Sequence, residues 1–393
     1  MPRLLLLGTH DTKAAGLGYL ADLLRAGGAQ VTTVDLSTRT PATDADISAQ
    51  LVASHHPDGA QAVLGHDERG PAVAAMGLAL ARFLPTIPAD GVLGIGGGGG
   101  TSMIATGLRA LPYGVPKLVV STLASGDTAP YIGISDLILM PAVTDLAGLN
   151  TLTRRILHNA AQAVLGMAAN PAPYVAGKPA LGLTMFGVTT PCVTAIAAGL
   201  PDYDCMVFHA TGTGGQTMEK LADGGLLTGL FDITTTEVAD HLFGGVLPCT
   251  ADRFGAAART RIRQVVSLGA LDMINFGAPE TVPPQHRNRL FYQHNPQVTL
   301  MRTTPAENAA MGTWIADRLN RCDGPTHLMI PETGLSALDA PGKPFHDPTA
   351  NDALFGSLEK AFHQTRNRRL TRLPLHINDP AFAAACLAAF LNL

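Results

Sequence analysis

The feature that most constrains this chain is a glycine run that separates an apolar segment from a helix-like segment. Residues 91–93 predict a strand, Gly96 to Gly100 are five consecutive glycines, and residues 103–110 predict a helix. Because glycine has no Cβ, such a turn lets backbone N–H groups approach a ligand, and the new helix adds unpaired donors and the positive end of its dipole. The pattern indicates an anion-binding turn, with a close-packed turn as the alternative.

Two familiar nucleotide motifs fit the run poorly. Gly94, Gly96 and Gly99 satisfy G-x-G-x-x-G, but no Asp or Glu ends the next predicted strand, residues 117–122. A dinucleotide fingerprint needs that acid for the ribose. A P-loop needs Gly-Lys followed by Ser or Thr, whereas both Gly-Lys pairs of this chain are followed by proline.

The composition indicates a cytoplasmic protein with room for two domains. Of its 393 residues 46% are hydrophobic and 15% charged, and the net charge of −4 gives no basic surface for direct nucleic-acid binding. No apolar run has transmembrane length, and residues 4–7 predict a strand instead of a signal peptide, so no membrane association is expected. The five cysteines lack C-x-x-C spacing, which favours reduced, buried thiols.

The first half predicts a nucleotide-binding α/β domain. A strand, a polar loop, a helix and a second strand form one βαβ unit, and the continuous apolar strands are typical of a parallel sheet. A proline-rich segment near residue 177 separates domain 1–176 from domain 177–393. The expected strands are residues 4–7, 31–36, 91–93, 117–122 and 134–140, and the expected helices are 17–24, 44–53, 70–84, 103–110 and 148–167.

The second half repeats this alternation and predicts a further α/β domain, which contacts substrate or a partner. Its glycine-rich turn at 212–215 follows a strand, so we interpret it as the counterpart of the first glycine run. The fold class is therefore α/β, with two Rossmann-like domains, mainly parallel sheets and a cleft between them. Strands are expected at 180–186, 203–210, 226–233, 271–276, 327–330 and 373–377, helices at 193–199, 217–222, 260–269, 307–320 and 380–393, and an irregular segment at 281–296.

Three polar loops that follow strands of the first domain form the candidate cofactor site. Ligands of parallel sheets bind beyond the carboxyl ends of the strands. Hydroxyls and lysine suit phosphate, a carboxylate suits Mg²⁺, and Asp35 suits a ribose; a helix cap or a turn is the alternative for these acids. The candidates are Thr9, Asp11, Thr12, Lys13, Asp35, Gly96, Gly97, Gly98, Gly99, Gly100, Thr101, Ser121, Ser125, Gly126 and Asp127, with Asp11 as the metal ligand.

The second domain offers a further anion turn and several acid–base candidates. Neither a metalloprotease helix motif nor a nucleophile elbow occurs in the sequence. The turn could bind the substrate or be a tight turn, and the polar loop after strand 327–330 could hold catalytic groups or be an ordinary loop. The turn residues are Gly212, Thr213, Gly214 and Gly215, and the catalytic candidates are Glu332, Asp339, Lys343, His346 and Asp347.

Five motifs together resemble one family. They are Gly8 to Lys13, Gly94 to Thr101, Val120 to Asp127, Thr211 to Gly215 and His294 to Pro296. The family comprises uncharacterised two-domain proteins related to the ATP-binding, N-terminal inhibitory domain of a plant tobamovirus-resistance protein. The resemblance implies ATP as cofactor and a dimer, and it implies phosphate and Mg²⁺ contacts for Asp11, Thr12, Lys13 and the glycine run.

The sequence thus predicts an Mg²⁺-dependent, ATP-utilising enzyme that acts on a small anionic metabolite as a homo-oligomer. The alternative is a nucleotide-gated binding module without turnover. An NAD-dependent oxidoreductase is a further alternative, which the missing acid after the glycine run disfavours.

Overall fold

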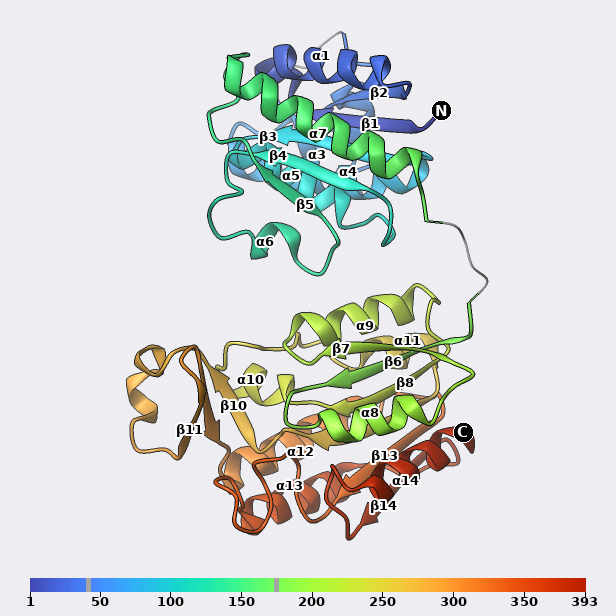
Figure 1. Ribbon diagram of the computed structural model, residues 1–393, viewed down its shortest axis with the longest axis vertical. Coiled ribbons are helices and arrows are strands. Elements are labelled where there is room, and N and C mark those ends of the chain that lie inside the picture. The colour runs from blue at the N-terminus through green and yellow to red at the C-terminus, as the bar shows by residue number, and fades with distance from the viewer. Residues whose placement is uncertain (40–43, 173–176) are drawn as a thin grey trace. The chain divides into compact units, whose positions relative to one another are not determined.

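The first half of the chain folds around a five-stranded parallel sheet with the order β2-β1-β3-β4-β5 (Figure 1). The computed structural model describes residues 1–39, 44–172 and 177–393. The strands are β1 (Arg3–Gly8), β2 (Gln30–Asp35), β3 (Gly91–Gly96), β4 (Lys117–Ser121) and β5 (Ile138–Pro141). The helices are α1 (His10–Ala26), α2 (Ala49–Ala53), α3 (Gln61–Leu64), α4 (Arg69–Phe83), α5 (Gly98–Leu108), α6 (Ala129–Ile132) and α7 (Thr151–Ala169).

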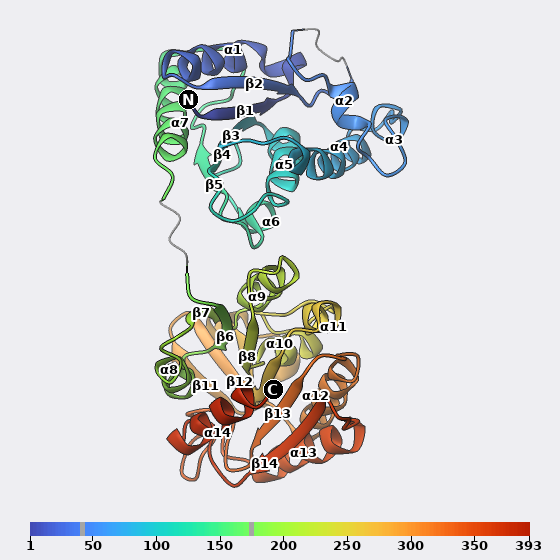
Figure 2. The same cartoon turned by 90° about the vertical axis from the view of Figure 1, so that its right-hand side faces the viewer.

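Alternate side chains of each strand pack against helices on opposite faces of this sheet. Leu4 and Leu6 of β1 join α1 and α7 in one core. Leu5 and Leu7 join α2, α4 and α5 in the other, and Figure 2 shows the two helix layers. A strand that is covered on both faces is apolar throughout, which is why β1 was recognisable as a parallel strand.

Several helices of the first domain differ from the prediction: α1 begins at His10 and not at residue 17, and α3 and α6 were not expected. α5 begins at Gly98, inside the glycine run, and not at residue 103. Glycine is a poor helix former, but packing of α5 on the core outweighs this local preference. The segment 44–53 is helical only from Ala49, because Ser48 caps α2 and Ile47 forms a parallel bridge with Val34.

The second half forms a six-stranded parallel sheet with the order β14-β13-β9-β8-β6-β7. The strands are β6 (Ala180–Met185), β7 (Asp204–His209), β8 (Gly229–Thr234), β9 (Gln264–Gly269), β13 (Thr326–Pro331) and β14 (Arg368–Leu373). The helices are α8 (Thr190–Ala198), α9 (Thr213–Asp223), α10 (Glu237–Phe243), α11 (Gly255–Thr260), α12 (Pro305–Leu319), α13 (Pro348–Ala361) and α14 (Pro380–Leu391).

This sheet is also covered on both faces. Met329 of β13 packs with α8 and α14, whereas Leu328 and Ile330 pack with α10, α12 and α13. The predicted α/β class with two mainly parallel sheets is therefore confirmed. The last strand was misplaced at 373–377, because arginines interrupt the apolar pattern of β14, an edge strand.

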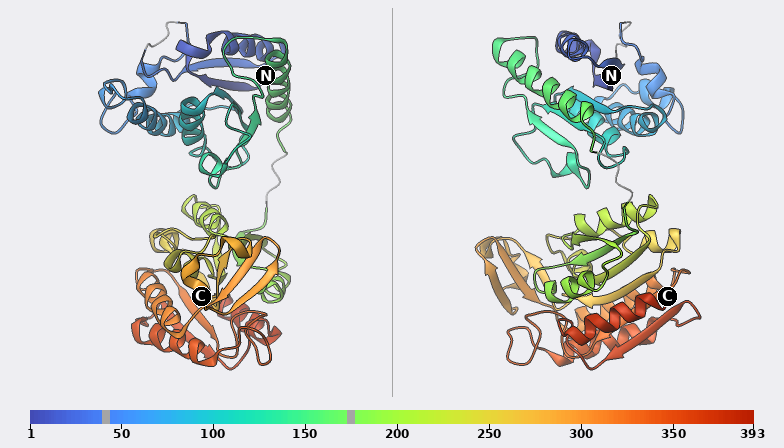
Figure 3. Two further views of the ribbon diagram at one scale, coloured as in Figure 1. Left: turned by 90° about the vertical axis from the view of Figure 1, so that its left-hand side faces the viewer. Right: turned by 45° about the vertical axis from the view of Figure 1, so that its right-hand side comes forward.

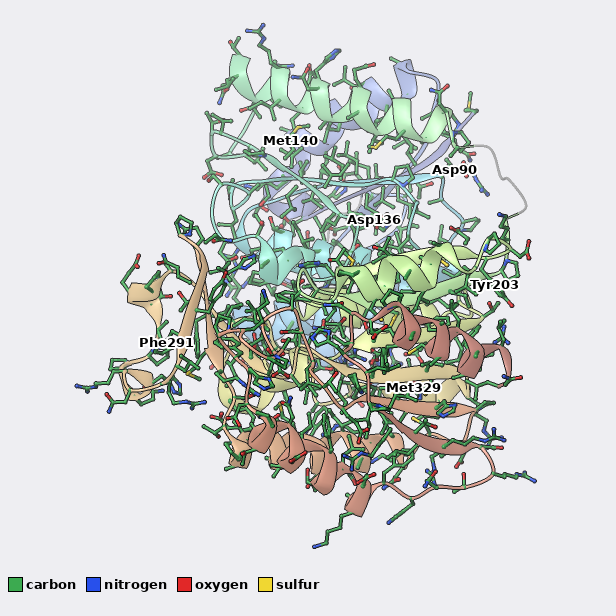
Figure 4. The ribbon with its side chains drawn as sticks, turned by 60° about the horizontal axis from the view of Figure 1, so that its bottom comes forward. Asp90, Asp136, Met140, Tyr203, Phe291 and Met329 are labelled. Atoms are coloured by element: carbon green, nitrogen blue, oxygen red, sulfur yellow. The ribbon has the colours of Figure 1, made fainter. Side chains whose placement is uncertain are left out.

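A three-stranded antiparallel sheet, β10-β12-β11, interrupts the second domain between β9 and β13. Its strands are β10 (Met273–Phe276), β11 (Phe291–Asn295) and β12 (Val298–Arg302). Figure 3 shows it in orange, extending from the second domain, and Figure 4 labels Phe291 at its outer strand and Met329 within the main sheet. The prediction of an irregular segment at 281–296 is wrong from residue 291 onward, because Phe291–Asn295 forms strand β11. The strand was missed because its last three residues are polar and exposed and its sequence has no apolar alternation. The helix expected at 260–269 is also wrong, because Gln264–Gly269 forms the buried strand β9.

The chain separates by its internal contacts into Met1–Tyr174 and Val175–Leu393. The predicted end of the first domain, residue 176, lies outside the described residues. Within the described ranges no helix is both long and apolar enough to cross a membrane.

Candidate functional site

The candidate site lies at the carboxyl edge of the first sheet, where the chain connections change direction. β1 lies between β2 and β3, and the connections to these two strands run to opposite sides of it. In doubly wound sheets this switch point leaves a crevice for a ligand. The strand ends are neighbours there, because Gly8 pairs with Asp35, and Ser121 pairs with both Gly96 and Pro141.

The loop after β1 is held in place by Asp35. This carboxylate is fully buried and accepts hydrogen bonds from the His10 amide (3.0 Å) and from the amide and hydroxyl of Ser37 (2.9 and 2.5 Å). The Ser37 hydroxyl oxygen in turn accepts from the Asp11 amide at 3.1 Å. All three bonds go to Oδ1, so the carboxylate positions this loop, and a ribose contact of Asp35 stays a prediction.

The same loop starts α1, and its candidate residues lie in the first helical turn. The N-cap is Thr9, so the alternative that Asp11 caps this helix is wrong. The hydroxyls of Thr9 and Thr12 are 2.8 Å apart. Asp11 and Lys13 project from the first turn into a cavity beside the glycine run.

The glycine run leads directly into a helix. Gly97 is the N-cap of α5, so the N–H groups of Gly98, Gly99 and Gly100 lie in its first turn and have no partner within the helix. None of the five glycines has a positive φ. Close approach explains glycine best at Gly96, where a Cβ would lie 2.5 Å from the Thr101 amide nitrogen.

Two candidates of this region serve the protein's own structure. The hydroxyl of Thr101 is buried, 2.7 Å from the hydroxyl of Ser121, and it donates to the Gly96 carbonyl at 3.2 Å. Ser121 Oγ also accepts from the Leu123 amide at 3.0 Å. These bonds tie the turn after β3 to the loop after β4, so the two hydroxyls position the backbone that faces the site.

Two cavities open beside these loops, and both are lined by Lys13 and Gly97. The smaller has a volume of about 400 Å³ and the larger about 770 Å³. The smaller is lined by Thr9, Asp11, Thr12, Lys13, Thr38, Arg39, Arg69, Val73, Gly97, Gly99, Gly100 and Met103. The larger is lined by Lys13, Gly97, Gly98, Ser121, Thr122, Ser125, Pro141, Ala142, Val143, Thr144 and Asp145.

The smaller cavity contains two arginines that sequence reasoning missed. Arg39 follows β2, and Arg69 is the first residue of α4. The Arg69 guanidinium lies over the first turn of α5, 3.3 Å from the position that a Cβ on Gly99 would take. With Lys13, the cavity thus combines three cationic side chains with helical N–H donors. A basic residue just after a strand end was the only local signal for Arg39.

The remaining candidates of the first domain are placed as follows. Ser125 lines the larger cavity. Gly126 and Asp127 belong to the same loop, and the carboxylate of Asp127, one residue before the N-cap of α6, Thr128, accepts from the Ala129 amide at 3.1 Å. Among the described residues no three His, Cys, Asp or Glu side chains form a metal cluster, so a cation at Asp11 would need ligand oxygens and water to complete its shell.

The glycine turn of the second domain is already occupied by a carboxylate of the chain itself. Glu237 Oε1 accepts hydrogen bonds from the amides of Gly212 (2.8 Å) and Gly215 (3.1 Å), and its other oxygen accepts from buried Arg253 at 3.0 Å. This turn follows β7, an edge strand that corresponds to β2 and not to β3. The interpretation of Gly212, Thr213, Gly214 and Gly215 as a counterpart of the first glycine run is therefore corrected.

The catalytic candidates of the second domain have separate structural roles. Glu332 accepts from Arg372 Nε at 2.7 Å, and Asp347 caps α13 through the Ala350 amide at 3.0 Å. Asp339 is buried and accepts from the Leu335 amide at 2.9 Å. Lys343 is exposed, and His346 Nδ1 lies 3.9 Å from an Asp339 oxygen.

Sequence reasoning missed the partner of Asp339, which is Asp272. Burial and the charge of Asp339 raise the pKa of Asp272 to about 7. Ser336 donates to Asp272 at 2.8 Å, whereas one oxygen of each aspartate has no hydrogen-bond partner within the described part of the chain. No sequence motif links these acids, because they meet only through the fold.

Comparisons with known proteins identify related chains. The N-terminal domain model of the uncharacterised protein family UPF0261 matches residues 2–173, and its C-terminal domain model matches residues 178–393. A UPF0261 protein of Mesorhizobium japonicum is 61% identical and is covered over 99% of its length by the whole of this chain. A UPF0261 protein of Clostridium tetani is 39% identical over 100% of this chain and 98% of its own length.

Two tomato proteins are similar as well. The ToMV resistance protein Tm-1(GCR237) of Solanum lycopersicum and the ToMV susceptible protein tm-1(GCR26) are each 42% identical over the whole of this chain. This chain spans 56% of the length of either tomato protein. A solved spinosyn rhamnosyltransferase in complex with spinosyn aglycone, covering 99% of this chain and 95% of its own, has 12% identity and a TM-score of 0.21, too low to indicate a common function.

Proposed function

The chain belongs to the uncharacterised protein family UPF0261, and we propose that it is an ATP-binding protein whose first domain holds the nucleotide together with Mg²⁺. The observation that carries this proposal is the smaller cavity, where Lys13, Arg39 and Arg69 surround the first turn of α5. Three cations and free backbone N–H groups within about 400 Å³ suit a polyphosphate chain.

Six of the lining residues have the following roles in this proposal. The amides of Gly99 and Gly100 and the ammonium of Lys13 donate to phosphate oxygens. Asp11 holds Mg²⁺, whose remaining ligands are phosphate oxygens and water, the usual coordination of this ion with nucleotides. The side chains of Val73 and Met103 add the apolar surface that a purine base requires.

We further propose that the protein is an enzyme that uses ATP on a small molecule, and that it acts as a homodimer. The alternative is a binding module that responds to the nucleotide without turnover. ATP consumption that depends on a second small molecule supports the enzyme, whereas stable binding without consumption supports the module. Sedimentation of the intact chain measures the oligomeric state.

The nucleotide site is tested by titrating ATP with Mg²⁺ into the intact chain and into Arg69→Ala. Loss of one charge-assisted hydrogen bond to phosphate contributes about 1.5–3 kcal/mol, so we expect about 10- to 100-fold weaker binding. The control is Arg82→Ala, which removes an exposed arginine near the opposite end of α4. Its affinity should stay within about twofold of the wild type.

Two outcomes contradict this assignment. Equal affinities for Arg69→Ala and Arg82→Ala would place the nucleotide elsewhere. A larger thermal stabilisation by NAD than by ATP with Mg²⁺ would overturn the choice of cofactor, because tighter ligands stabilise the folded state more at equal concentration.

A further inference from the structure

The larger cavity differs in chemistry from the smaller one. Its lining includes four hydroxyl-bearing residues, Ser121, Thr122, Ser125 and Thr144, together with other residues of the loops after β4 and β5. Among the described residues that line it, Lys13 is the single cation and Asp145 the single acid. The opposite charges of these two side chains offset each other, so the cavity has no excess of positive charge for an anionic ligand.

The loop after β5 holds a strained residue at the edge of this cavity. Val143 has φ of 64° and an exposed side chain, and the Thr144 amide donates to the Ala142 carbonyl at 2.7 Å across it. A β-branched residue rarely adopts positive φ, and a turn of this kind persists where the surrounding structure enforces it. The residues that follow this turn, Thr144 and Asp145, line the cavity. The strained turn thus determines the position of two lining residues.

Lys13 connects the two cavities. Its ammonium lies 3.9 Å from a carboxylate oxygen of Asp145, and the lysine side chain is only 15% exposed. A phosphate that is bound by Lys13 in the smaller cavity therefore has Asp145 as its neighbour on the side of the larger one.

We propose, building on the ATP site proposed above, that the larger cavity binds an uncharged, hydroxyl-bearing acceptor that receives the terminal phosphoryl group of the nucleotide. Hydroxyls and backbone groups recognise such a ligand by hydrogen bonds in both directions. The sequence predicts an anionic substrate; the balanced charge of this lining favours a neutral one.

In the proposed reaction, the γ-phosphoryl group moves from ATP to the acceptor hydroxyl. An acceptor hydroxyl oxygen forms a bond to the γ-phosphorus of ATP, the bond from that phosphorus to the oxygen bridging to the β-phosphate breaks, and ADP leaves with this electron pair. The acceptor proton passes to the carboxylate of Asp145 and from there to solvent, since this side chain is 77% exposed. Asp145 is thus the general base, and Lys13 stabilises the charge of the transferring group.

The test is ATP consumption with glycerol, ribose, glucose and myo-inositol as acceptors, with products followed by ³¹P NMR. We expect at least one acceptor to raise turnover about tenfold or more, with one phosphomonoester formed per ADP. Asp145→Asn should lower kcat by about 10²- to 10⁴-fold. Ser125→Phe should abolish the stimulation by filling the cavity, and Asp22→Asn, an exposed acid on α1, should behave as the wild type.

Failure of the acceptor site can be distinguished from failure of the ATP site. If ATP binds but none of the four acceptors raises turnover, or if the stimulation survives in both Asp145→Asn and Ser125→Phe, the acceptor assignment is overturned. Stimulation by succinate or citrate alone would contradict the neutral class of acceptor. Failure of the wild type to bind ATP would instead overturn the proposed function.

Discussion

Gly96 is the residue of the glycine run that leaves no room for a side chain. A Cβ at Gly96 would lie 2.5 Å from the Thr101 amide nitrogen, whereas a Cβ at Gly98 would have a Leu123 methyl as its nearest neighbour, at 3.6 Å. Because backbone atoms cannot move aside as a flexible side chain can, we expect Gly96→Ala to destabilise the first domain by about 1–3 kcal/mol. Urea unfolding of the wild type and of Gly96→Ala measures this loss of free energy of unfolding.

The matched control for that prediction is Gly98→Ala. Its added methyl makes an ordinary contact in an existing helix, so stability should change by less than about 1 kcal/mol. Equal destabilisation of Gly96→Ala and Gly98→Ala would show that the turn after β3 does not depend on the close approach at Gly96.

Asp272 makes the stability of the second domain depend on pH. Its pKa is raised from 3.8 to about 7 by burial and by the charge of Asp339, while Arg302 acts in the opposite direction. Between these two values the folded protein binds more protons than the unfolded chain, so its free energy of unfolding falls as the pH rises through about 7. Asp272→Asn removes this proton uptake.

We therefore expect Asp272→Asn to gain stability relative to the wild type on going from about pH 5 to pH 8, by about 5 °C or more in Tm. Scanning calorimetry at both pH values measures the difference. A constant offset between variant and wild type at the two pH values contradicts the assignment of a raised pKa to Asp272.

At the scale of elements, helices and strands could be predicted from the sequence where burial imposes a recognisable pattern of apolar residues. Strands such as β1 were predicted because a strand covered on both faces is apolar throughout, whereas the buried parallel strand β9 was mistaken for part of a helix. The antiparallel strand β11 was missed because its exposed, polar residues show neither a continuous apolar run nor an apolar alternation. The start of α5 was missed because packing outweighs the low helix propensity of glycine.

The candidate site was predicted in part for the same reason. The loops after β1, β3 and β4 were found from their place behind strands, and they line shared cavities. Arg39 and Arg69 were missed because distant segments bring them together. The turn at Gly212 was misread because a glycine turn has the same sequence whether a ligand or a carboxylate such as Glu237 occupies it.

At the scale of the whole molecule, two sheets share a strand order but differ at their switch points. β7-β6-β8-β9-β13 repeats the order β2-β1-β3-β4-β5. In the first domain this edge holds two cavities beside free helical donors. In the second domain the buried hydroxyls of Thr189 and Thr234 meet there at 2.8 Å, and the nearby glycine turn is filled by Glu237. The proposed ATP site in the first domain therefore predicts one nucleotide per chain.

The most direct test of this account is the stoichiometry of ATP binding to the intact chain by isothermal titration calorimetry with Mg²⁺. The account predicts one nucleotide per chain, with binding weakened about 100-fold or more by the double variant Lys13→Met with Arg69→Ala, since two phosphate contacts are lost. No binding, two nucleotides per chain, or an affinity that the double variant leaves unchanged would contradict the claim that the first domain alone holds ATP.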